Sequence, residues 1–203
     1  MDLARARQVL AAHAPALLAP ADRLPCAVAL VLRQGAAGVE LLYIERARQE
    51  GDPWSGHLAF PGGRLEAADA GPRQAAERET REEVDLDLSA AEYLGRLDDV
   101  TAAGLTVVVS GYAYALADAP PVLTLSPEVQ SAFWVPLGRL LEPERQRLEV
   151  FPVHGGQRRR LPAVDLLGPG RPLLWGVTYR FTARLLELVG VPLPGSGEGA
   201  SPP

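Results

Sequence analysis

The chain has 203 residues, of which 47% are hydrophobic and 22% charged, a composition typical of one globular domain of moderate size. Its formal net charge of −5 argues against a surface that binds nucleic acid. A single cysteine excludes an internal disulfide and favours a reducing compartment. No apolar run reaches transmembrane length and the N-terminus lacks a secretory pattern, so we expect a cytoplasmic protein without a membrane segment.

The first half of the chain predicts a helix, two strands and a second helix. Apolar residues recur at helical spacing over residues 3–18. Two strands are expected over residues 27–33 and 39–46, joined by a glycine turn. A polar loop with glycine and proline covers residues 47–57. The second helix is expected over residues 72–84, because Pro72 is a suitable first helical residue.

The next part of the chain predicts further strands. Residues 93–98 and 105–116 read as strands, and the second has β-branched residues at its start. Residues 128–134 are expected to open as a helical turn and to continue as a strand. A short helix is expected over residues 137–141.

The last part predicts a hairpin, a helix and a tail. The hairpin pairs residues 150–153 with residues 159–164, and the helix covers residues 175–189. Residues 192–203 contain mostly glycine, proline and serine, so we expect a disordered tail. We therefore predict one domain over residues 1–191.

An acidic stretch of the second helix carries the chemistry. Glu79 and Glu83 are four residues apart and Glu82 lies beside them, so three carboxylates share one helical face. Their repulsion predicts a compensating cation, and oxygen-only ligands indicate Mg²⁺ or Mn²⁺ rather than Zn²⁺. Gly62 and Gly63 lie just upstream, where backbone without a Cβ can approach a phosphate or a metal. The alternative is a solvated face on which neighbouring arginines neutralise the glutamates.

The stretch Gly63–Leu86 resembles the Nudix box, a pattern written G-x5-E-x7-R-E-U-x-E-E-x-G-U in which U is aliphatic. The second half matches over Arg78–Leu86, with Thr80 at an aliphatic position and Asp85 in place of the glycine. Asp85 is expected to keep the left-handed helix end, because aspartate is one of the few residues that visit positive φ. The first half is one residue longer than the pattern and has Asp69 where the first glutamate would stand. The same longer spacing occurs in the coenzyme A pyrophosphatase branch of the family.

Further segments, from about Ala27 to Leu188, also resemble that branch. The resemblance implies an α/β fold, the Nudix α/β/α sandwich with a mixed sheet. It also implies metal-dependent hydrolysis of the diphosphate linkage of a small-molecule nucleoside diphosphate derivative. Coenzyme A or its thioesters are the leading candidates, with 3′,5′-ADP and 4′-phosphopantetheine as products. The alternatives are a nucleotide sugar, a dinucleotide or an NTP as substrate, or a non-catalytic nucleotide-binding sensor. A homodimer stays open.

The resemblance assigns roles to particular residues. The metal ligands for Mg²⁺ or Mn²⁺ would be Glu79, Glu82, Glu83 and the Gly63 carbonyl. The catalytic residues would be Glu82, Glu83, Glu128 and Arg78, which pairs with a box glutamate. Glu128 is expected to be a further metal ligand or the general base. The alternative for Glu128 is a carboxylate that stabilises a helix N-terminus.

Arg46, Gly62 and Gly63 are the residues expected to bind substrate. A 3′-phosphate on coenzyme A would need a positive group, since a buried unpaired dianion is prohibitive. We favour Arg46 over the Arg158–Arg160 run for this contact, because Arg46 is nearer to the glycine turn in the sequence. Solvated hairpin arginines are the favoured interpretation of that run.

Four other residues have two interpretations each. His57 is a candidate base, but a plain loop residue is favoured. Trp54, Phe60 and Trp175 are able to stack on an adenine. For Phe60 and Trp175 we favour packing in the core.

Overall fold

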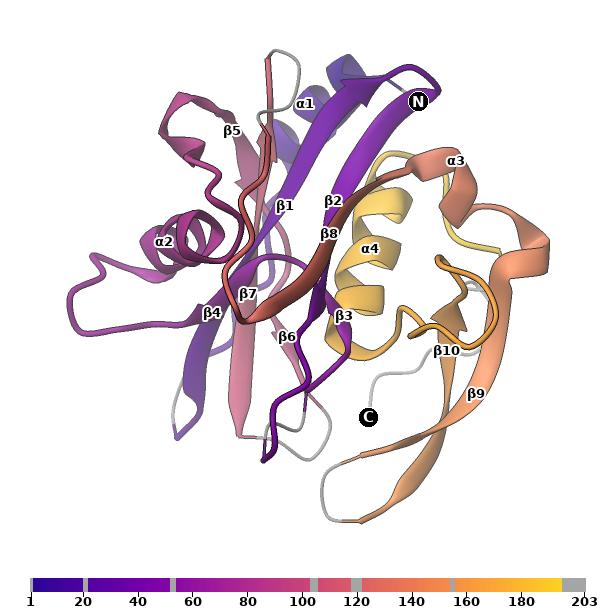
Figure 1. Ribbon diagram of the computed structural model, residues 1–203. Helices are drawn as coiled ribbons and strands as arrows, with labels where there is room; N and C mark the ends of the chain where they lie inside the picture. Colours follow the sequence, from indigo (N-terminus) through magenta and orange to yellow (C-terminus); the bar gives the residue numbers. More distant parts are fainter. Residues whose placement is uncertain are drawn as a thin grey trace.

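The computed structural model describes residues 2–19, 22–51, 54–102, 106–117, 122–153 and 156–194. This part of the chain forms an eight-stranded sheet, a separate two-stranded hairpin and four α-helices (Figure 1). The strands of the large sheet are β1 (Leu24–Gly35), β2 (Gly38–Arg46), β3 (Leu58–Ala59), β4 (Gly62–Arg64), β5 (Glu92–Arg96), β6 (Val100–Thr101), β7 (Val107–Ala115) and β8 (Val129–Pro136). The hairpin consists of β9 (Gln146–Pro152) and β10 (Arg158–Val164). The helices are α1 (Leu3–Ala12), α2 (Pro72–Val84), α3 (Leu137–Leu140) and α4 (Gly176–Leu188).

The large sheet is mixed, as predicted. Its main path runs β3-β2-β1-β7-β5, with β4 beside β1, β6 beside β7 and β8 beside β2. Strands β1 and β7 are parallel, with residues 24–32 opposite residues 107–115, and the other pairs are antiparallel. Strand β1 pairs with β4 at residues 26–28 and with β2 at residues 32–35. The glycine turn therefore lies against the middle of the sheet.

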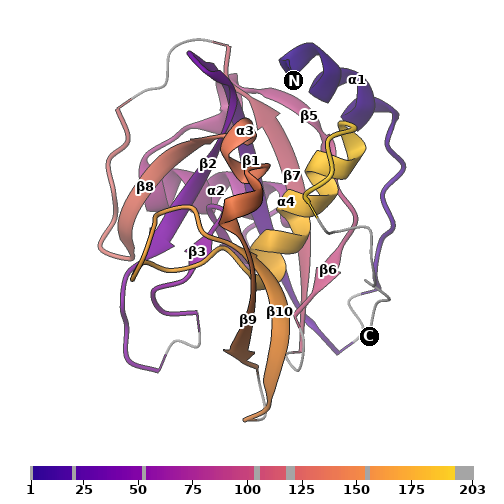
Figure 2. The ribbon, with the colours of Figure 1, turned by 90° about the vertical axis from the view of Figure 1, so that its right-hand side faces the viewer.

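Helices cover both faces of this sheet. Helix α2 packs on one face, whereas α1 and α4 pack on the other (Figures 1 and 2). Side chains of β1 alternate between the two: Ala29 and Val31 join the core under α2, and Leu30 and Leu32 join the core with α4. The predicted α/β sandwich is thus confirmed. None of the described helices combines the length and the apolar composition needed to span a membrane.

Helix α2 begins and ends at the predicted residues, Pro72 and Val84. Asp85 follows it with φ 55° and ψ 36°, and its N–H donates to the Arg81 carbonyl at 2.9 Å. Among the described non-glycine residues, only Asp85 has a positive φ. The left-handed helix end predicted for Asp85 is confirmed.

Two predicted elements and the start of the predicted disordered tail differ from the structure. The N-terminal helix ends at Ala12 rather than at residue 18, because His13 is already extended two residues before Pro15. Glu128 lies in a turn directly before β8, so the predicted helical turn is wrong. Leu193, in the predicted tail, is 2% exposed and packs in the core; residues 195–203 of that tail lie outside the described residues.

Asp98 ties the segment after α1 to helix α4. Its carboxylate accepts hydrogen bonds from the Ala16 N–H at 2.7 Å and from Arg184 Nε at 2.6 Å, and it bonds His13 Nε2 at 3.2 Å. Burial alone would raise the pKa of Asp98, but the Ala16 and Arg184 contacts outweigh it and lower this pKa below its ordinary value. The charged carboxylate therefore stabilises the fold at neutral pH.

We expect Asp98→Asn to lower the free energy of unfolding by about 1–2 kcal/mol at pH 7, since the charge-assisted bonds are weakened. The lowered pKa means that the charged form contributes fully above the ordinary carboxyl pKa. This contribution disappears as the pH falls through the lowered pKa, so the two proteins should converge in strong acid. Urea unfolding at several pH values measures both effects. Asp22→Asn is the control, because Asp22 is exposed and makes no hydrogen bond to a described residue. A pH-independent difference for Asp98→Asn would contradict this account.

Candidate active site

Glu83 connects α2 to the glycine turn. Its side chain is buried, and Oε2 accepts a hydrogen bond from the Gly62 N–H at 2.9 Å. Arg46 Nη1 lies 3.8 Å from the other carboxylate oxygen, Oε1. Burial raises the pKa of Glu83 to about 7, against the opposing effects of Gly62 and Arg46, and the charges of Glu79 and Glu128 add to the rise. A buried carboxylate with few compensating charges is an unusual feature that points to a functional site.

Arg78 lies at the centre of an ion-pair network. Its Nη1 donates to Glu79 Oε1 and to Glu82 Oε2, each at 3.0 Å. Its Nε and Nη2 donate to the two oxygens of Asp69 at 3.1 and 3.0 Å, and Nη2 also reaches the Arg64 carbonyl at 3.1 Å. These bonds from Arg78, with one from the Glu66 N–H, lower the pKa of Asp69. One guanidinium thus fixes two box glutamates and the loop before α2, and the predicted pairing of Arg78 with a box glutamate is present.

Close approach requires a glycine at position 62 and favours one at position 63. Gly62 has φ 151°, and a Cβ there would lie 2.3 Å from the Ala27 carbonyl oxygen, in the backbone of β1. A Cβ on Gly63 would lie 2.3 Å from Glu79 Oε1, so the carboxylate occupies the space that a side chain would fill. The turn therefore brings bare backbone against an acidic side chain.

Glu79 and Glu83 lie against this turn, and the charges of Glu82 and Glu128 affect them. Burial raises the pKa of Glu79, against the effect of Arg78, and the charges of Glu82 and Glu128 raise it further. Glu82 is the most open of the three box glutamates, with a 57% exposed side chain. The charge of Glu128 raises the pKa of both Glu79 and Glu83, so this fourth carboxylate, in the turn before β8, lies near the box.

These oxygen donors suit a hard divalent cation. Among the described residues, however, no three carboxylate, imidazole or thiol groups form a ready-made metal site. The reason is visible in the hydrogen bonds: Glu79 and Glu82 share Arg78, and Glu83 is turned to Gly62. Glu79 and Glu82 each bond Arg78 through one carboxylate oxygen and keep the other oxygen as a potential ligand. The metal ligands predicted from the sequence stay a prediction.

Arg46 lies at the end of β2 and joins two parts of the site. Its guanidinium points to Glu83, while its backbone N–H donates to the His57 carbonyl at 3.0 Å. The next residue, Ala47, donates its N–H to the Glu128 carbonyl at 2.8 Å. The predicted substrate-binding residues Arg46, Gly62 and Gly63 therefore gather at the carboxylates.

A separate pocket of about 320 Å³ lies beyond His57, on the side of the hairpin. It is lined by residues from the loop after β2, from β9 and from the segment before α4: Arg48, Gly56, His57, Phe151, Pro152, Gly170, Arg171, Pro172, Leu173 and Trp175. Trp175 stacks on Phe151 with ring centroids 4.1 Å apart and meets the edge of His57 at 5.1 Å. The core position expected for Trp175 is therefore wrong, because this half-buried ring lines a pocket. Phe60 does lie in the core, 2% exposed and stacked on Tyr43.

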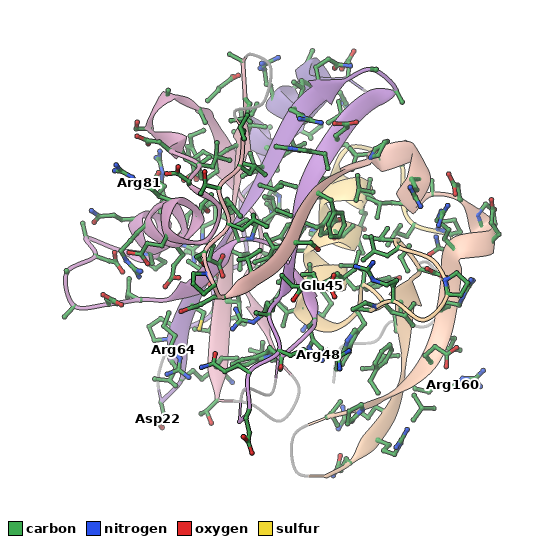
Figure 3. The ribbon with its side chains drawn as sticks, viewed as in Figure 1. Asp22, Glu45, Arg48, Arg64, Arg81 and Arg160 are labelled. Carbon is green, nitrogen blue, oxygen red and sulfur yellow. The ribbon has the colours of Figure 1, made fainter. Side chains whose placement is uncertain are left out.

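The Arg158–Arg160 run lies apart from the carboxylates, on β10 (Figure 3). All three side chains are exposed. Arg159 is opposite Phe151 and Arg160 is opposite Val150, so successive arginines point to opposite faces of the hairpin. The run does not form one basic patch.

Sequence reasoning missed two features. Asp69 was recognised only as a departure from the box, although it is the main partner of Arg78; its place in the box was the available signal. The pocket around Trp175 had no sequence signal, because its three segments are far apart in the chain.

The chain is similar to proteins of one known family. Residues 23–153, more than half of the chain, match the model of the NUDIX domain family. Human mitochondrial coenzyme A diphosphatase NUDT8 is 34% identical over 152 residues, which cover 73% of this chain and 62% of that protein. The mouse mitochondrial coenzyme A diphosphatase NUDT8 is 31% identical over 193 residues, covering 93% of this chain and 88% of that protein. The chain spans only part of the length of three relatives that it matches: 34% and 42% of two proteins from Schizosaccharomyces pombe, and 62% of the human protein.

Solved structures agree on the fold. A MutT/nudix family protein from Enterococcus faecalis superimposes with a TM-score of 0.50 at 16% identity, covering 83% of this chain and 68% of that one. At this identity the likeness shows the fold alone. The match to the family model and the similarity to the mouse protein show that the chain belongs to the Nudix family.

Proposed function

We propose that this protein is a metal-dependent hydrolase that cleaves the diphosphate linkage of a nucleoside diphosphate derivative. The observation that carries the proposal is the placement of Glu79 and Glu83 against a glycine turn, with Arg46 beside Glu83 and with Glu82 and Glu128 close enough to affect their charge. Such a site offers acidic groups for a cation and a guanidinium for a phosphate. Nudix hydrolases generally use divalent metals, and we propose Mg²⁺ or Mn²⁺ here.

The residues have separable tasks in this proposal. Glu79, Glu82, Glu83 and the Gly63 carbonyl would hold the cation, which when bound supplies charge neutralisation and Lewis acidity toward the diphosphate. Arg78 would fix the rotamers of Glu79 and Glu82 between turnovers, and Asp69 would fix Arg78. Arg46 would contact a diphosphate oxygen. Glu128 is proposed to accept a proton from the attacking water or to contribute to the cation site.

Coenzyme A or its thioesters are the proposed substrates. Two relatives that match most of this chain are named as coenzyme A diphosphatases. Water would add to one phosphorus while the bridging P–O bond breaks, giving 3′,5′-ADP and 4′-phosphopantetheine with release of protons. The test is a set of diphosphates, including coenzyme A, dephospho-coenzyme A, a nucleotide sugar and a dinucleotide, incubated with Mg²⁺ or Mn²⁺. Mass spectrometry of the products identifies the bond cleaved, and absence of any diphosphate hydrolysis would refute the proposal.

We expect Glu82→Gln and Glu83→Gln each to lower turnover at least ~10²-fold, because each removes a charged ligand from the cation. Circular dichroism should show intact folding. Glu77→Gln is the matched control: Glu77 lies on the same helix, but it bonds Arg73 and Tyr114 instead of the box. Near wild-type rates for both box variants at saturating Mg²⁺ would rule out this role for the acidic face.

Chelation tests the cation separately. We expect EDTA to abolish hydrolysis and added Mg²⁺ or Mn²⁺ to restore it, since the carboxylates alone repel the diphosphate. Isothermal titration of the metal alone into wild-type protein gives a readout independent of activity. Full activity in EDTA after exhaustive dialysis would speak against a cation.

Arg46→Ala tests the assignment of Arg46 to the diphosphate. Because Arg46 lies 3.8 Å from Glu83, we now expect it to act on coenzyme A and dephospho-coenzyme A alike. Loss of one charge-assisted contact should lower kcat/KM for both by about 10- to 100-fold. Arg81→Ala is the control, since Arg81 lies on the outer side of α2 (Figure 3). An effect confined to coenzyme A would instead return Arg46 to the 3′-phosphate contact predicted from the sequence.

A further inference from the structure

The pocket around Trp175 combines aromatic rings with arginine side chains. Its walls combine three aromatic rings, His57, Phe151 and Trp175, with two arginines, Arg48 and Arg171. Its volume of about 320 Å³ falls within the range of small-molecule sites. Flat rings stack on a base, and guanidinium groups bind phosphate oxygens.

The two arginines differ in what surrounds them. Arg171 Nη2 donates to Glu45 Oε2 at 2.7 Å, so its charge is already compensated. Arg48 is exposed at the rim and forms no hydrogen bond or ion pair with any residue that the structure describes. Its side chain instead runs past Gly56, where a Cβ would meet Arg48 Cγ at 3.7 Å. Arg48 is therefore the cation of this pocket that is available to an anion.

Arg46 connects the pocket wall to the carboxylates. Arg46 donates its backbone N–H to His57, which lines the pocket, and directs its guanidinium to Glu83. For a substrate with its diphosphate at the Arg46 guanidinium, the pocket is a nearby site for one end, because its wall residue His57 pairs with the Arg46 backbone. A pantetheine arm carries neither an aromatic ring nor an anionic group of its own, whereas a phosphorylated adenosine carries both.

We propose that this pocket binds the 3′-phosphoadenosine end of the substrate, with the adenine against Trp175 and the 3′-phosphate at Arg48. The choice of this ligand rests on the proposed function. The proposal separates the arginine at the end of β2 from the one in the following loop: Arg46 contacts the diphosphate, and Arg48 contacts the 3′-phosphate. It also gives His57 a place in the wall of the pocket.

The test measures binding of 3′,5′-ADP, which lacks a diphosphate and is not turned over. Isothermal titration is carried out on the full chain, with 5′-AMP and 4′-phosphopantetheine as comparison ligands. We expect Arg48→Ala to weaken 3′,5′-ADP binding by about 10- to 100-fold and to change 5′-AMP binding much less, because 5′-AMP lacks the 3′-phosphate. Trp175→Leu should weaken both nucleotides by about 10-fold or more through the lost stacking.

Arg160→Ala is the matched control, because Arg160 is an exposed arginine on the opposite face of the hairpin from Phe151 (Figure 3). Arg48 is on the surface, so its variant tests the proposal even if Trp175→Leu fails to fold. Unchanged 3′,5′-ADP binding in Arg48→Ala, no wild-type binding at millimolar ligand, or a loss confined to 4′-phosphopantetheine would each overturn the proposal.

Hydrolysis assays on the same proteins keep the two proposals apart. If wild-type protein hydrolyses coenzyme A while Arg48→Ala and Trp175→Leu bind 3′,5′-ADP normally, the pocket assignment falls and the proposed function stands. If no diphosphate is hydrolysed but 3′,5′-ADP binding depends on Arg48 and Trp175, the pocket assignment stands and the proposed function falls.

Discussion

The site depends on the ion pairs that the Arg78 guanidinium forms with the surrounding carboxylates. Three carboxylates on one helical face repel each other, and Arg78 offsets this repulsion by bonding two of them, Glu79 and Glu82. Arg78 binds Glu79 and Glu82 with one nitrogen and uses the rest of its fork for Asp69 and the Arg64 carbonyl. The same residue therefore offsets the repulsion on the helix and anchors the loop that leads into it. A lysine could not make these divergent bonds, because it lacks the planar fork.

Glu83 is stabilised differently, by burial against backbone. Its partner is the Gly62 N–H, and Gly62 in turn is held where only a glycine fits, between the Ala27 carbonyl and Val28. The large strand β1 thus positions the turn, the turn positions Glu83, and Arg46 on the neighbouring strand β2 faces the same carboxylate. This chain of contacts explains why the site lies over the middle of the sheet.

The sequence predicted those parts of the fold that local chemistry dictates. Helix α2 has the predicted bounds because Pro72 starts it and Asp85 ends it, and the main strands follow from their apolar patterns. The three box glutamates were predicted from their spacing along one helix, which is also a local property of the sequence. Glu128 was predicted as a candidate site residue, but its predicted helical conformation is wrong. A turn over residues 126–128, and not a helix, precedes β8. The pocket around Trp175 could not be predicted, because it forms where residues about a hundred positions apart meet.

The parallel pairing of β1 with β7 has a consequence for how the chain folds. Residues 24–32 must pair with residues 107–115 to form this central ladder, and the whole Nudix box lies in the chain segment between them. Closing such a long loop costs conformational entropy before any contact compensates it, which makes this step slow compared with the formation of α2. Strand β4, with Gly62, pairs with residues 26–28 of the same strand β1. The arrangement of Glu83 and Gly62 therefore depends on β1, and a fragment that contains the box alone would lack the backbone that holds it.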